Sequence, residues 1–358
     1  MEGLIKQLKI TKTENPKAKP DPATLGFGEV FTDHMFIADY DEGQGWHDPR
    51  IVPYGPIPLD PAAAVLHYAQ EMFEGLKTYR AADGGLNLFR PDMNAKRTNV
   101  SNDRICLPLI DEEFYVDAIK ALLEVDKDWA PDYPGTSLYI RPFTFANEPF
   151  LGVRPAKSYY FMIILSPVGS YYKGGLQPTK IYVEGKYVRS AVGLAGNAKV
   201  GGNYAMSLKS QVEAQAKGYT QVLWLDGIER RYVEEIGTSN AFFVMDGEVF
   251  TAPLTGTILP GVTRDSVIRI LKERGVTVRE ERFTIEEVYA SADKGKLEEV
   301  FASGTAAVIS PVGEMLWNDR HILINGGEIG PLAQSLYDTI TGIQSGTLPD
   351  PYGWTVRL

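Results

Sequence analysis

The spacing of apolar and polar positions predicts short strands interleaved with helices in the first half of the chain. Residues 137–146 and 158–167 are runs of β-branched and aromatic side chains, and the second run is apolar enough for an interior strand. Apolar side chains recur at helical spacing over 112–129, and another helix is expected over 92–104. The Gly-Gly pair at 84–85 separates two strand-like stretches and indicates a hairpin. We therefore expect an α+β first half, with the two strands as neighbours in one sheet.

The second half begins after a stretch in which glycine and proline break any regular pattern. We place an interdomain linker over 169–181, between a smaller N-terminal α+β domain at 1–168 and a larger C-terminal domain at 182–358. Asp-Gly pairs at 226 and 246 lie between strand-like runs and predict hairpins. Helices are expected at 205–217, at 264–274, after the capping-box pattern TIEE at 284–287, and from about 331.

Length and charge narrow the class of protein. A chain of 358 residues exceeds the usual length of a single core, which agrees with two domains. The net charge is −10 and no Lys/Arg-rich run stands out, so we expect neither nucleic acid nor an anionic membrane as a partner. The N-terminus lacks the apolar core of a secretory signal, and no segment supplies about 18 uninterrupted apolar residues, which favours a cytoplasmic protein. The first 20 or so residues are expected to form an arm or a mobile end with little chemistry.

Cysteine and histidine offer little chemistry. The single cysteine, Cys106, lies among apolar neighbours in RICLPL and is expected to be an inert core thiol, and one cysteine excludes a disulfide within the chain. The four histidines are widely spaced and form no metal-ligand pattern, so we expect no metal site.

One lysine has an unusual setting. Lys199 lies in GLAGNAKVGGNY at 193–204, among glycines and small side chains rather than among solvating charges. Most lysines are surface residues, but Gly201 and Gly202 lack the Cβ atoms that would obstruct a bulky planar ligand. Burial would also favour the neutral amine, which is the nucleophile that attacks a carbonyl. Lys199 is therefore a candidate for covalent catalysis.

Two adjacent carboxylates end a predicted strand. Glu234 and Glu235 precede Gly-Thr-Ser-Asn at 237–240, which breaks the strand. Because neighbouring side chains of a strand point to opposite faces, at most one of the two carboxylates is expected to point inward. A pair of surface carboxylates is the ordinary alternative. The hydroxyls and amides of the turn could grip an anion beside an inward carboxylate.

Two further turns carry groups that bind anions. The Pro-Gly turn at 260–261 leads into a helix whose first amides, at Val262 and Thr263, suit a phosphate. The turn at 303–305 places hydroxyl and amide donors between strand-like stretches. Neither turn has the spacing of a P-loop or a dinucleotide fold. With a glycine-flanked lysine and an inward carboxylate, they form the set that pyridoxal phosphate requires: an amine for its aldehyde, an anion for its ring nitrogen and donors for its phosphate.

Several sequence blocks, in the right order, resemble the branched-chain amino acid aminotransferases, which are class IV aminotransferases of pyridoxal-phosphate fold type IV. The resemblance runs from about residue 27 to the C-terminus. Its most specific blocks are FTDHMF at 31–36, EMFEGLKTYR at 71–80, LYIRPF at 138–143, GNAKVGGNYAMS at 196–207, EEIGTSN at 234–240, LPGVTRDS at 259–266 and SGTAAVISPVGE at 303–314. It implies a two-domain α+β fold with the cofactor at the domain interface and a cofactor-binding C-terminal domain.

The resemblance also implies the cofactor site. Lys199 would form the Schiff base with pyridoxal 5′-phosphate, and Glu235 would pair with the pyridine nitrogen, which leaves Glu234 without a function. Tyr204 would bind the phenolic oxygen. The remaining cofactor-binding positions are Thr238, and for the phosphate Arg97, Val262, Thr263 and Thr305.

The substrate positions are implied in the same way. Those around the substrate are Phe27, Phe73, Tyr139, Arg141, Tyr171, Thr238 and Ala306, and those from the partner subunit of a homodimer are Tyr68, Leu151 and Val153. An apolar pocket with donors at its edge suits branched side chains and the second carboxylate of glutamate. We expect reversible ping-pong transfer of the amino group between L-leucine, L-isoleucine or L-valine and 2-oxoglutarate, giving branched 2-oxo acids and L-glutamate.

Three alternatives stay open. A D-amino acid aminotransferase or an aminodeoxychorismate lyase would share the lysine, the glutamate and the phosphate site, but the aromatic and arginine content of 71–80 and 138–143 favours the branched-chain activity. A non-catalytic binding homologue would be expected to lack Lys199 or Glu235.

Mammalian relatives carry Cys-x-x-Cys where this chain has Ala307 and Ser310, so no thiol redox switch is expected there.

Overall fold

The computed structural model describes residues 3–169 and 175–358, and the chain divides into two compact units. Unit 1 comprises the described residues within 1–171, together with 198–201 and 342–358, and unit 2 comprises those within 172–197 together with 202–341. This differs from the contiguous division expected from the sequence. The C-terminal segment returns to unit 1 because strand β18 (Thr355–Arg357) pairs with β6 (Leu86–Phe89). The linker over 169–181 includes residues outside the described ranges and stays a prediction.

Unit 1 is built on a sheet in which neighbouring strands are mostly antiparallel. Besides β6 and β18, its strands are β1 (Lys9–Ile10), β2 (His34–Asp41), β3 (Gly45–Pro53), β4 (Glu71–Phe73), β5 (Leu76–Arg80), β7 (Ser137–Ala146) and β8 (Ser158–Val168). Their order is β1-β3-β2-β8-β7-β5-β6-β18, and β4 pairs with β7. The two apolar runs predicted as strands are β7 and β8, which are antiparallel neighbours. β5 and β6 form the hairpin expected at the Gly-Gly pair.

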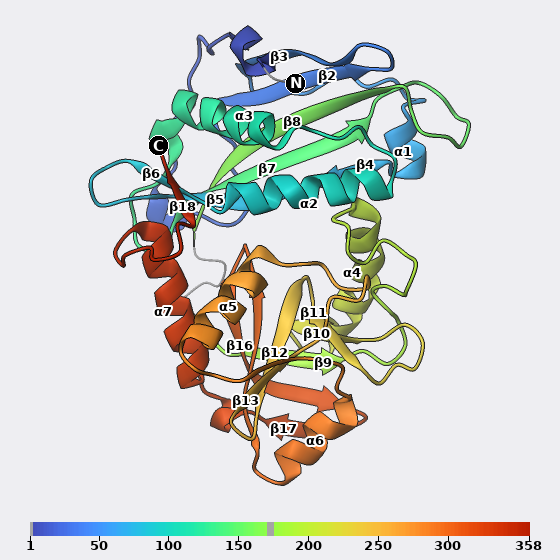
Figure 1. The fold of residues 1–358 in the computed structure, drawn as a ribbon, viewed down its shortest axis with the longest axis vertical. Helices are drawn as coiled ribbons and strands as arrows, with labels where there is room; N and C mark the ends of the chain where they lie inside the picture. Colours follow the sequence, from blue (N-terminus) through green and yellow to red (C-terminus); the bar gives the residue numbers. More distant parts are fainter. Residues whose placement is uncertain (1–2, 170–174) are drawn as a thin grey trace. The chain divides into compact units, whose positions relative to one another are not determined.

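Helices α2 (Pro91–Arg104) and α3 (Glu112–Val125) lie along one face of this sheet, and the short α1 (Ala64–Tyr68) precedes β4 (Figure 1). The Asp111 carboxylate accepts a hydrogen bond from the Phe114 N–H (2.9 Å) and so caps the start of α3. Its apolar stripe is buried against the sheet. The helix ends before the expected residue 129, because the chain tightens into a 3-10 turn at Lys127–Trp129.

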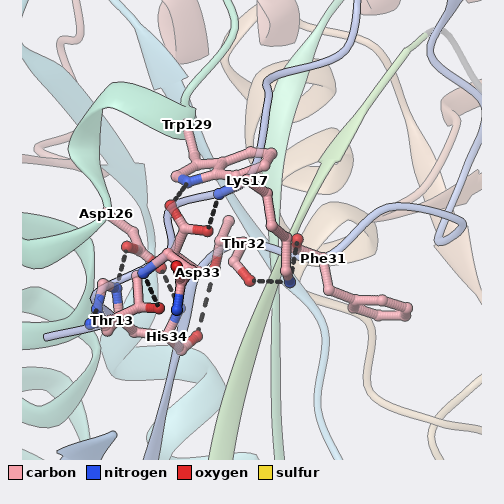
Figure 2. Close-up of polar contacts among 9 residues, drawn as sticks. Thr13, Lys17, Phe31, Thr32, Asp33, His34, Asp126 and Trp129 are labelled. Carbon is pink, nitrogen blue, oxygen red and sulfur yellow. Dashed lines mark hydrogen bonds and ion pairs between the residues drawn. The ribbon is translucent and has the colours of Figure 1, made fainter. Parts of the chain in front are cut away.

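The N-terminal arm is fastened to unit 1 by polar contacts (Figure 2). The Thr13 N–H donates to Nε2 of His34 (2.9 Å), whose Nδ1 lies 2.6 Å from Asp126 Oδ1. The Lys17 N–H donates to Asp33 Oδ1 (2.9 Å). Residues 13–17 therefore form part of an arm held by these contacts, and the expectation that the arm carries little chemistry stays a prediction. The sequence pattern did not show these contacts because they join positions 16 to 92 residues apart.

Unit 2 contains a second mixed sheet. Its strands are β9 (Thr179–Val183), β10 (Gln221–Leu225), β11 (Val233–Ile236), β12 (Ser239–Met245), β13 (Glu248–Thr251), β14 (Val278–Glu280), β15 (Leu297–Gly304), β16 (Val308–Trp317) and β17 (Arg320–Leu323). Its helices are α4 (Gly201–Ala216), α5 (Val262–Glu273) and α6 (Ile285–Asp293), and α7 (Pro331–Ser345) continues into unit 1. Because β11 pairs with both β10 and β12, the strands β11-β10-β9-β16-β15-β12 close into a ring. Helices beside mixed sheets in both units confirm the α+β class.

The two Asp-Gly pairs have different outcomes. Asp246 and Gly247 have φ of 52° and 78° and join β12 to β13 directly, because Met245 pairs with Glu248. At Asp226 the carboxylate instead accepts hydrogen bonds from four backbone N–H groups, those of residues 228, 229, 231 and 232. β10 and β11 are antiparallel as expected, but a longer loop joins them.

Cys106 is not a core thiol. Its φ is 57°, in the turn after α2, and its side chain is exposed, whereas its neighbour Leu107 is buried. The left-handed turn reverses the chain, so the apolar run does not enter the core as one segment. Within the described ranges, no helix combines the length and apolar character needed to cross a membrane.

Candidate active site

Lys199 is held by backbone contacts in unit 1. Its N–H donates to Ser101 Oγ of α2 (2.8 Å), and its carbonyl oxygen accepts from the N–H of Phe73 (3.0 Å). Its half-buried side chain places Nζ 4.6 Å from the centroid of the Phe73 ring. The lysine is therefore fixed against an aromatic residue and is not a surface solubilising group.

The two glycines after Lys199, Gly201 and Gly202, differ in the space available beside them. A Cβ atom at Gly201 would lie 1.7 Å from Oε1 of Glu71, so any larger residue there would displace the Glu71 carboxylate. A Cβ atom at Gly202 would meet no atom within 4 Å. The expectation that both glycines make room for a ligand stays a prediction. Both glycines lie at the very start of α4.

Arg97 is buried on α2 and forms a two-pronged ion pair with Glu74. Its Nε donates to Glu74 Oε1 (2.7 Å) and its Nη2 donates to Oε2 (2.8 Å). Burial raises the pKa of Glu74, but Arg97, Lys199 and Asn94 together hold that pKa below its ordinary value. Sequence reasoning missed Glu74, although it lies inside the EMFEGLKTYR block, because its partner is 23 residues away.

Four of the predicted substrate residues lie together in unit 1. The rings of Phe27 and Tyr139 meet edge to face, with centroids 5.0 Å apart. Arg141 donates to the Tyr139 hydroxyl (3.0 Å), and its guanidinium carbon lies 4.6 Å from the Phe73 centroid. A Cβ atom at Gly75 would lie 2.0 Å from the Tyr139 hydroxyl oxygen, so glycine makes room for this tyrosine. The cluster is an aromatic surface with one cation.

A buried cation in the same sheet was not predicted. Lys77 pairs with Tyr139 across β5 and β7, and it is only 7% exposed. Burial lowers the pKa of Lys77 to about 8. A lysine inside the strand-like run GLKTYR is itself the sequence signal.

The positions expected to come from a partner subunit lie on the surface of unit 1. Tyr68 is 42% exposed and its hydroxyl donates to the carbonyl oxygen of Leu151. Leu151 and Val153 are 61% and 85% exposed. Tyr171 lies outside the described residues.

Unit 2 contains a hollow of about 290 Å³ that opens to solvent. It includes three predicted positions, Tyr204, Glu235 and Thr238. The complete lining is Arg189, Asn203, Tyr204, Ser207, Glu235, Gly237, Thr238 and Leu259. The first turns of α4 therefore face the turn that follows β11.

Glu235 is held in this hollow by one cation and one amide. Nε of Arg189 lies 2.6 Å from Glu235 Oε2, and Asn240 Nδ2 donates to Oε1 (2.9 Å). Arg189 also donates to the carbonyl oxygens of Gly196 (3.0 Å) and Thr257. Sequence reasoning found the turn that contains Asn240 but assigned it to an external anion. Here its amide binds the carboxylate of the protein.

Glu234 is also buried, which corrects the expectation that only one of the two carboxylates points inward easily. It is 6% exposed. All four residues of β11 are buried, so side chains on both faces of this short strand are covered. Burial raises the pKa of Glu234 to about 7, despite the opposing effects of Thr257 and Arg189.

The two predicted anion-binding turns come together beside Asn240. α5 begins at Val262 and Thr263 after Gly261, whose Cβ, if present, would lie 2.1 Å from Asn240 Oδ1, so no capping side chain occupies the helix start. Asn240 pairs with Ser303 in the β12–β15 register, and Thr305 and Ala306 follow in the next turn. Among the described residues, the buried hydroxyl of Ser303 has no hydrogen-bond partner. These donors fit a phosphate group.

Comparison with known proteins places these features in context. Residues 71–315 match the family described as Amino-transferase class IV. The chain is 55% identical over 351 residues to branched-chain-amino-acid aminotransferase 2 of Bacillus subtilis (strain 168), covering 98% of this chain and 97% of that protein. The crystal structure of the branched-chain amino acid aminotransferase of Escherichia coli superposes with a TM-score of 0.74 at 28% identity, covering 89% of this chain and 98% of that chain. The branched-chain amino acid aminotransferase of Thermobaculum terrenum, in its PLP form, has a TM-score of 0.73 at 25% identity, covering 90% of this chain and 97% of that chain.

Proposed function

Because the chain belongs to the class IV aminotransferase family, we propose that it transfers the amino group between L-leucine, L-isoleucine or L-valine and 2-oxoglutarate, giving branched 2-oxo acids and L-glutamate. Its cofactor is pyridoxal 5′-phosphate. The similarity to a branched-chain-amino-acid aminotransferase along nearly the whole chain supports this substrate class. The observation that carries the proposal is the cluster of Phe27, Phe73 and Tyr139 around Arg141.

This cluster suits both half-reactions. Its aromatic rings provide apolar contact for a branched aliphatic side chain, and aromatic surface gains much free energy when it is buried. Arg141 and the Tyr139 hydroxyl are donors for the second carboxylate of glutamate. One surface can therefore accept two substrates that differ in charge, in the alternating order that a ping-pong reaction requires.

The donors in unit 2 fit the cofactor. The Glu235 carboxylate, held by Arg189 and Asn240, would bind a protonated ring nitrogen, and Tyr204 and Thr238 line the same hollow. The start of α5 at Val262 and Thr263, with Thr305, would bind the phosphate. From unit 1, the guanidinium of Arg97 would supply a cation for the same group. Ala306 would lie beside the substrate.

Lys199 has the central role. When bound, pyridoxal phosphate supplies an aldehyde that carries the amino group and a ring that accepts electrons. Lys199 Nζ would hold the aldehyde between turnovers and, once released, move the proton from the substrate Cα. The fixed backbone of Lys199 and the Phe73 ring keep Nζ in place. Glu235 would keep the ring nitrogen protonated, which makes the Cα proton acidic.

The test is amino transfer by the purified protein. With L-leucine, 2-oxoglutarate and cofactor, we expect L-glutamate and the branched 2-oxo acid in equal amounts. Lys199→Ala should abolish this activity and the visible absorbance of bound cofactor. The exposed Lys209, paired with Glu213, provides a matched control, and Lys209→Ala should leave both unchanged. Product from D-alanine without any from L-leucine would overturn the substrate assignment in favour of a D-amino acid aminotransferase.

We also propose that the protein is a cytoplasmic homodimer. Tyr68, Leu151 and Val153 are exposed on unit 1, and a second copy that covered them would bury apolar surface. Sedimentation equilibrium tests this assembly. A monomer at micromolar concentration with full activity would overturn it.

A further inference from the structure

Glu74 is a fully buried carboxylate with four directed contacts. Arg97 donates from Nε to Oε1 (2.7 Å) and from Nη2 to Oε2 (2.8 Å). Oε2 also accepts from Asn94 Nδ2 (2.7 Å) and from the N–H of Gly75 (3.0 Å). Two parallel bonds between planar groups fix the plane of a guanidinium, which a single-point contact does not. The orientation of Arg97 is therefore set by Glu74.

One face of α2 positions both this ion pair and Lys199. Asn94, Arg97 and Ser101 are spaced three and four residues apart, so they lie on the same side of the helix. The first two bind Glu74, and Ser101 accepts from the N–H of Lys199 (2.8 Å). Phe73 directly precedes Glu74 and donates to the carbonyl oxygen of Lys199 (3.0 Å). Glu74, Arg97 and Lys199 are thus parts of one rigid arrangement.

Stability alone is a weak reason for such a pair. Removing two charges from water has a desolvation cost that their attraction often fails to exceed, and apolar residues of the same volume often stabilise a core equally well. An anion that fixes the plane of a guanidinium has a clearer use in a site that must bind a phosphate.

We propose that Glu74 is a positioning residue, which fixes Arg97 to bind the phosphate of the cofactor. This inference rests on the proposed function. It assigns to Glu74 an effect on binding of the phosphate group, rather than a general effect on folding.

The test compares binding of pyridoxal phosphate with binding of pyridoxal, which lacks the phosphate. The measured quantity is the affinity for pyridoxal phosphate divided by the affinity for pyridoxal. For Glu74→Gln we expect this ratio to fall about 10- to 100-fold, because charge-assisted bonds that orient Arg97 are lost. The affinity for pyridoxal should change less than about 3-fold. Asp126→Asn is the matched control, because Asp126 is also buried and hydrogen-bonded in unit 1 but contacts His34 instead of Arg97. The affinity ratio of the Asp126→Asn variant should equal that of the unmodified protein.

A double-mutant cycle with Arg97→Met tests whether Glu74 acts on phosphate binding through Arg97. If Glu74 acts through Arg97, adding Glu74→Gln to Arg97→Met should lower the ratio less than about 3-fold further. Equal losses of pyridoxal phosphate and pyridoxal affinity in Glu74→Gln, or fully additive losses in the cycle, would overturn the inference.

Two safeguards keep the result decisive. If Glu74→Gln does not fold, Glu74→Asp keeps the charge but withdraws it by one methylene. It should lower the ratio about 3- to 10-fold, and an unchanged ratio would refute the positioning role. Failure of the proposed function looks different, because the unmodified protein would then bind pyridoxal phosphate but form no L-glutamate from L-leucine and 2-oxoglutarate.

Discussion

Glu234 makes the stability of this protein depend on pH in a predictable direction. Its carboxylate is 6% exposed, and among the described residues its Oε2 atom has no hydrogen-bond partner. Burial raises its pKa from 4.5 to about 7, Thr257 and Arg189 oppose this increase, and the nearby anions Glu235 and Asp226 add to it. A group whose folded pKa lies above its unfolded pKa stabilises the folded state below the unfolded value. That contribution is lost progressively as the pH rises through the folded value.

The size of the effect follows from the two pKa values. A difference of about 2.5 between the folded value near 7 and the unfolded value of 4.5 corresponds to about 3 kcal/mol at pH 8. Glutamine has the shape of a protonated glutamate but does not titrate. Glu234→Gln should therefore exceed the free energy of unfolding of the unmodified protein by less than about 1 kcal/mol at pH 5 and by about 1 to 3 kcal/mol at pH 8, since local relaxation reduces the full value.

The assay is equilibrium denaturation by urea at pH 5 and pH 8, with the cofactor at saturation in both samples. Glu248→Gln is the matched control, because the pKa of Glu248 is lowered by Arg279, and its replacement should give no stabilisation at pH 8. A Glu234→Gln variant whose unfolding free energy differs from that of the unmodified protein by the same amount at both pH values would refute the reasoning.

Three substitutions outside the site test how the fold is built. Gly247→Ala should destabilise the β12–β13 hairpin by about 1 kcal/mol in urea denaturation, because its φ of 78° strains any residue that has a Cβ atom, even though no other atom obstructs that Cβ. Gly185→Ala is the control: this position also has free space but no positive φ, so the substitution should be neutral. Thr284→Ala removes the capping box of α6 and should cost about 1 kcal/mol by the same assay, with no change in activity. His34→Phe leaves Asp126 buried without its partner and should cost about 3 kcal/mol; limited proteolysis should then cleave faster within residues 3–20, and an unchanged rate would show that the arm does not depend on His34.

Local sequence predicted those elements whose cause is local. The β12–β13 hairpin needs two consecutive residues with positive φ, and Asp246-Gly247 supplies them. The capping box at 284–287 is complete within four residues. The second Asp-Gly pair shows the limit, because the Asp226 side chain binds four backbone N–H groups and holds a longer loop open. A dipeptide signal does not reveal that competition.

The candidate site was predictable to the extent that its residues carry their own chemistry. Lys199 and Glu235 lie in sequence motifs that predict an amine and an anion at these positions. In the structure, the Lys199 backbone is bound by Ser101 and the Glu235 carboxylate by Arg189. Arg189 and Glu74 had no such motif, because their roles arise from pairing with positions 46 and 23 residues away. Likewise Gly201 was assigned to a ligand, although Glu71 occupies the space beside it.

Three buried glutamates show why such partners decide function. Glu74 has Arg97, Asn94 and a backbone N–H, and these contacts outweigh its burial and lower its pKa. Glu235 has Arg189 and Asn240, which favour a carboxylate where a ring nitrogen would bind. Glu234 has one carboxyl oxygen without a partner, so burial dominates and raises its pKa to about 7. Strand β11 places Glu234 and Glu235 beside different neighbours, so two identical adjacent side chains have different polar contacts. The sequence shows both carboxylates, but only the placement of Arg189 and Asn240 distinguishes them.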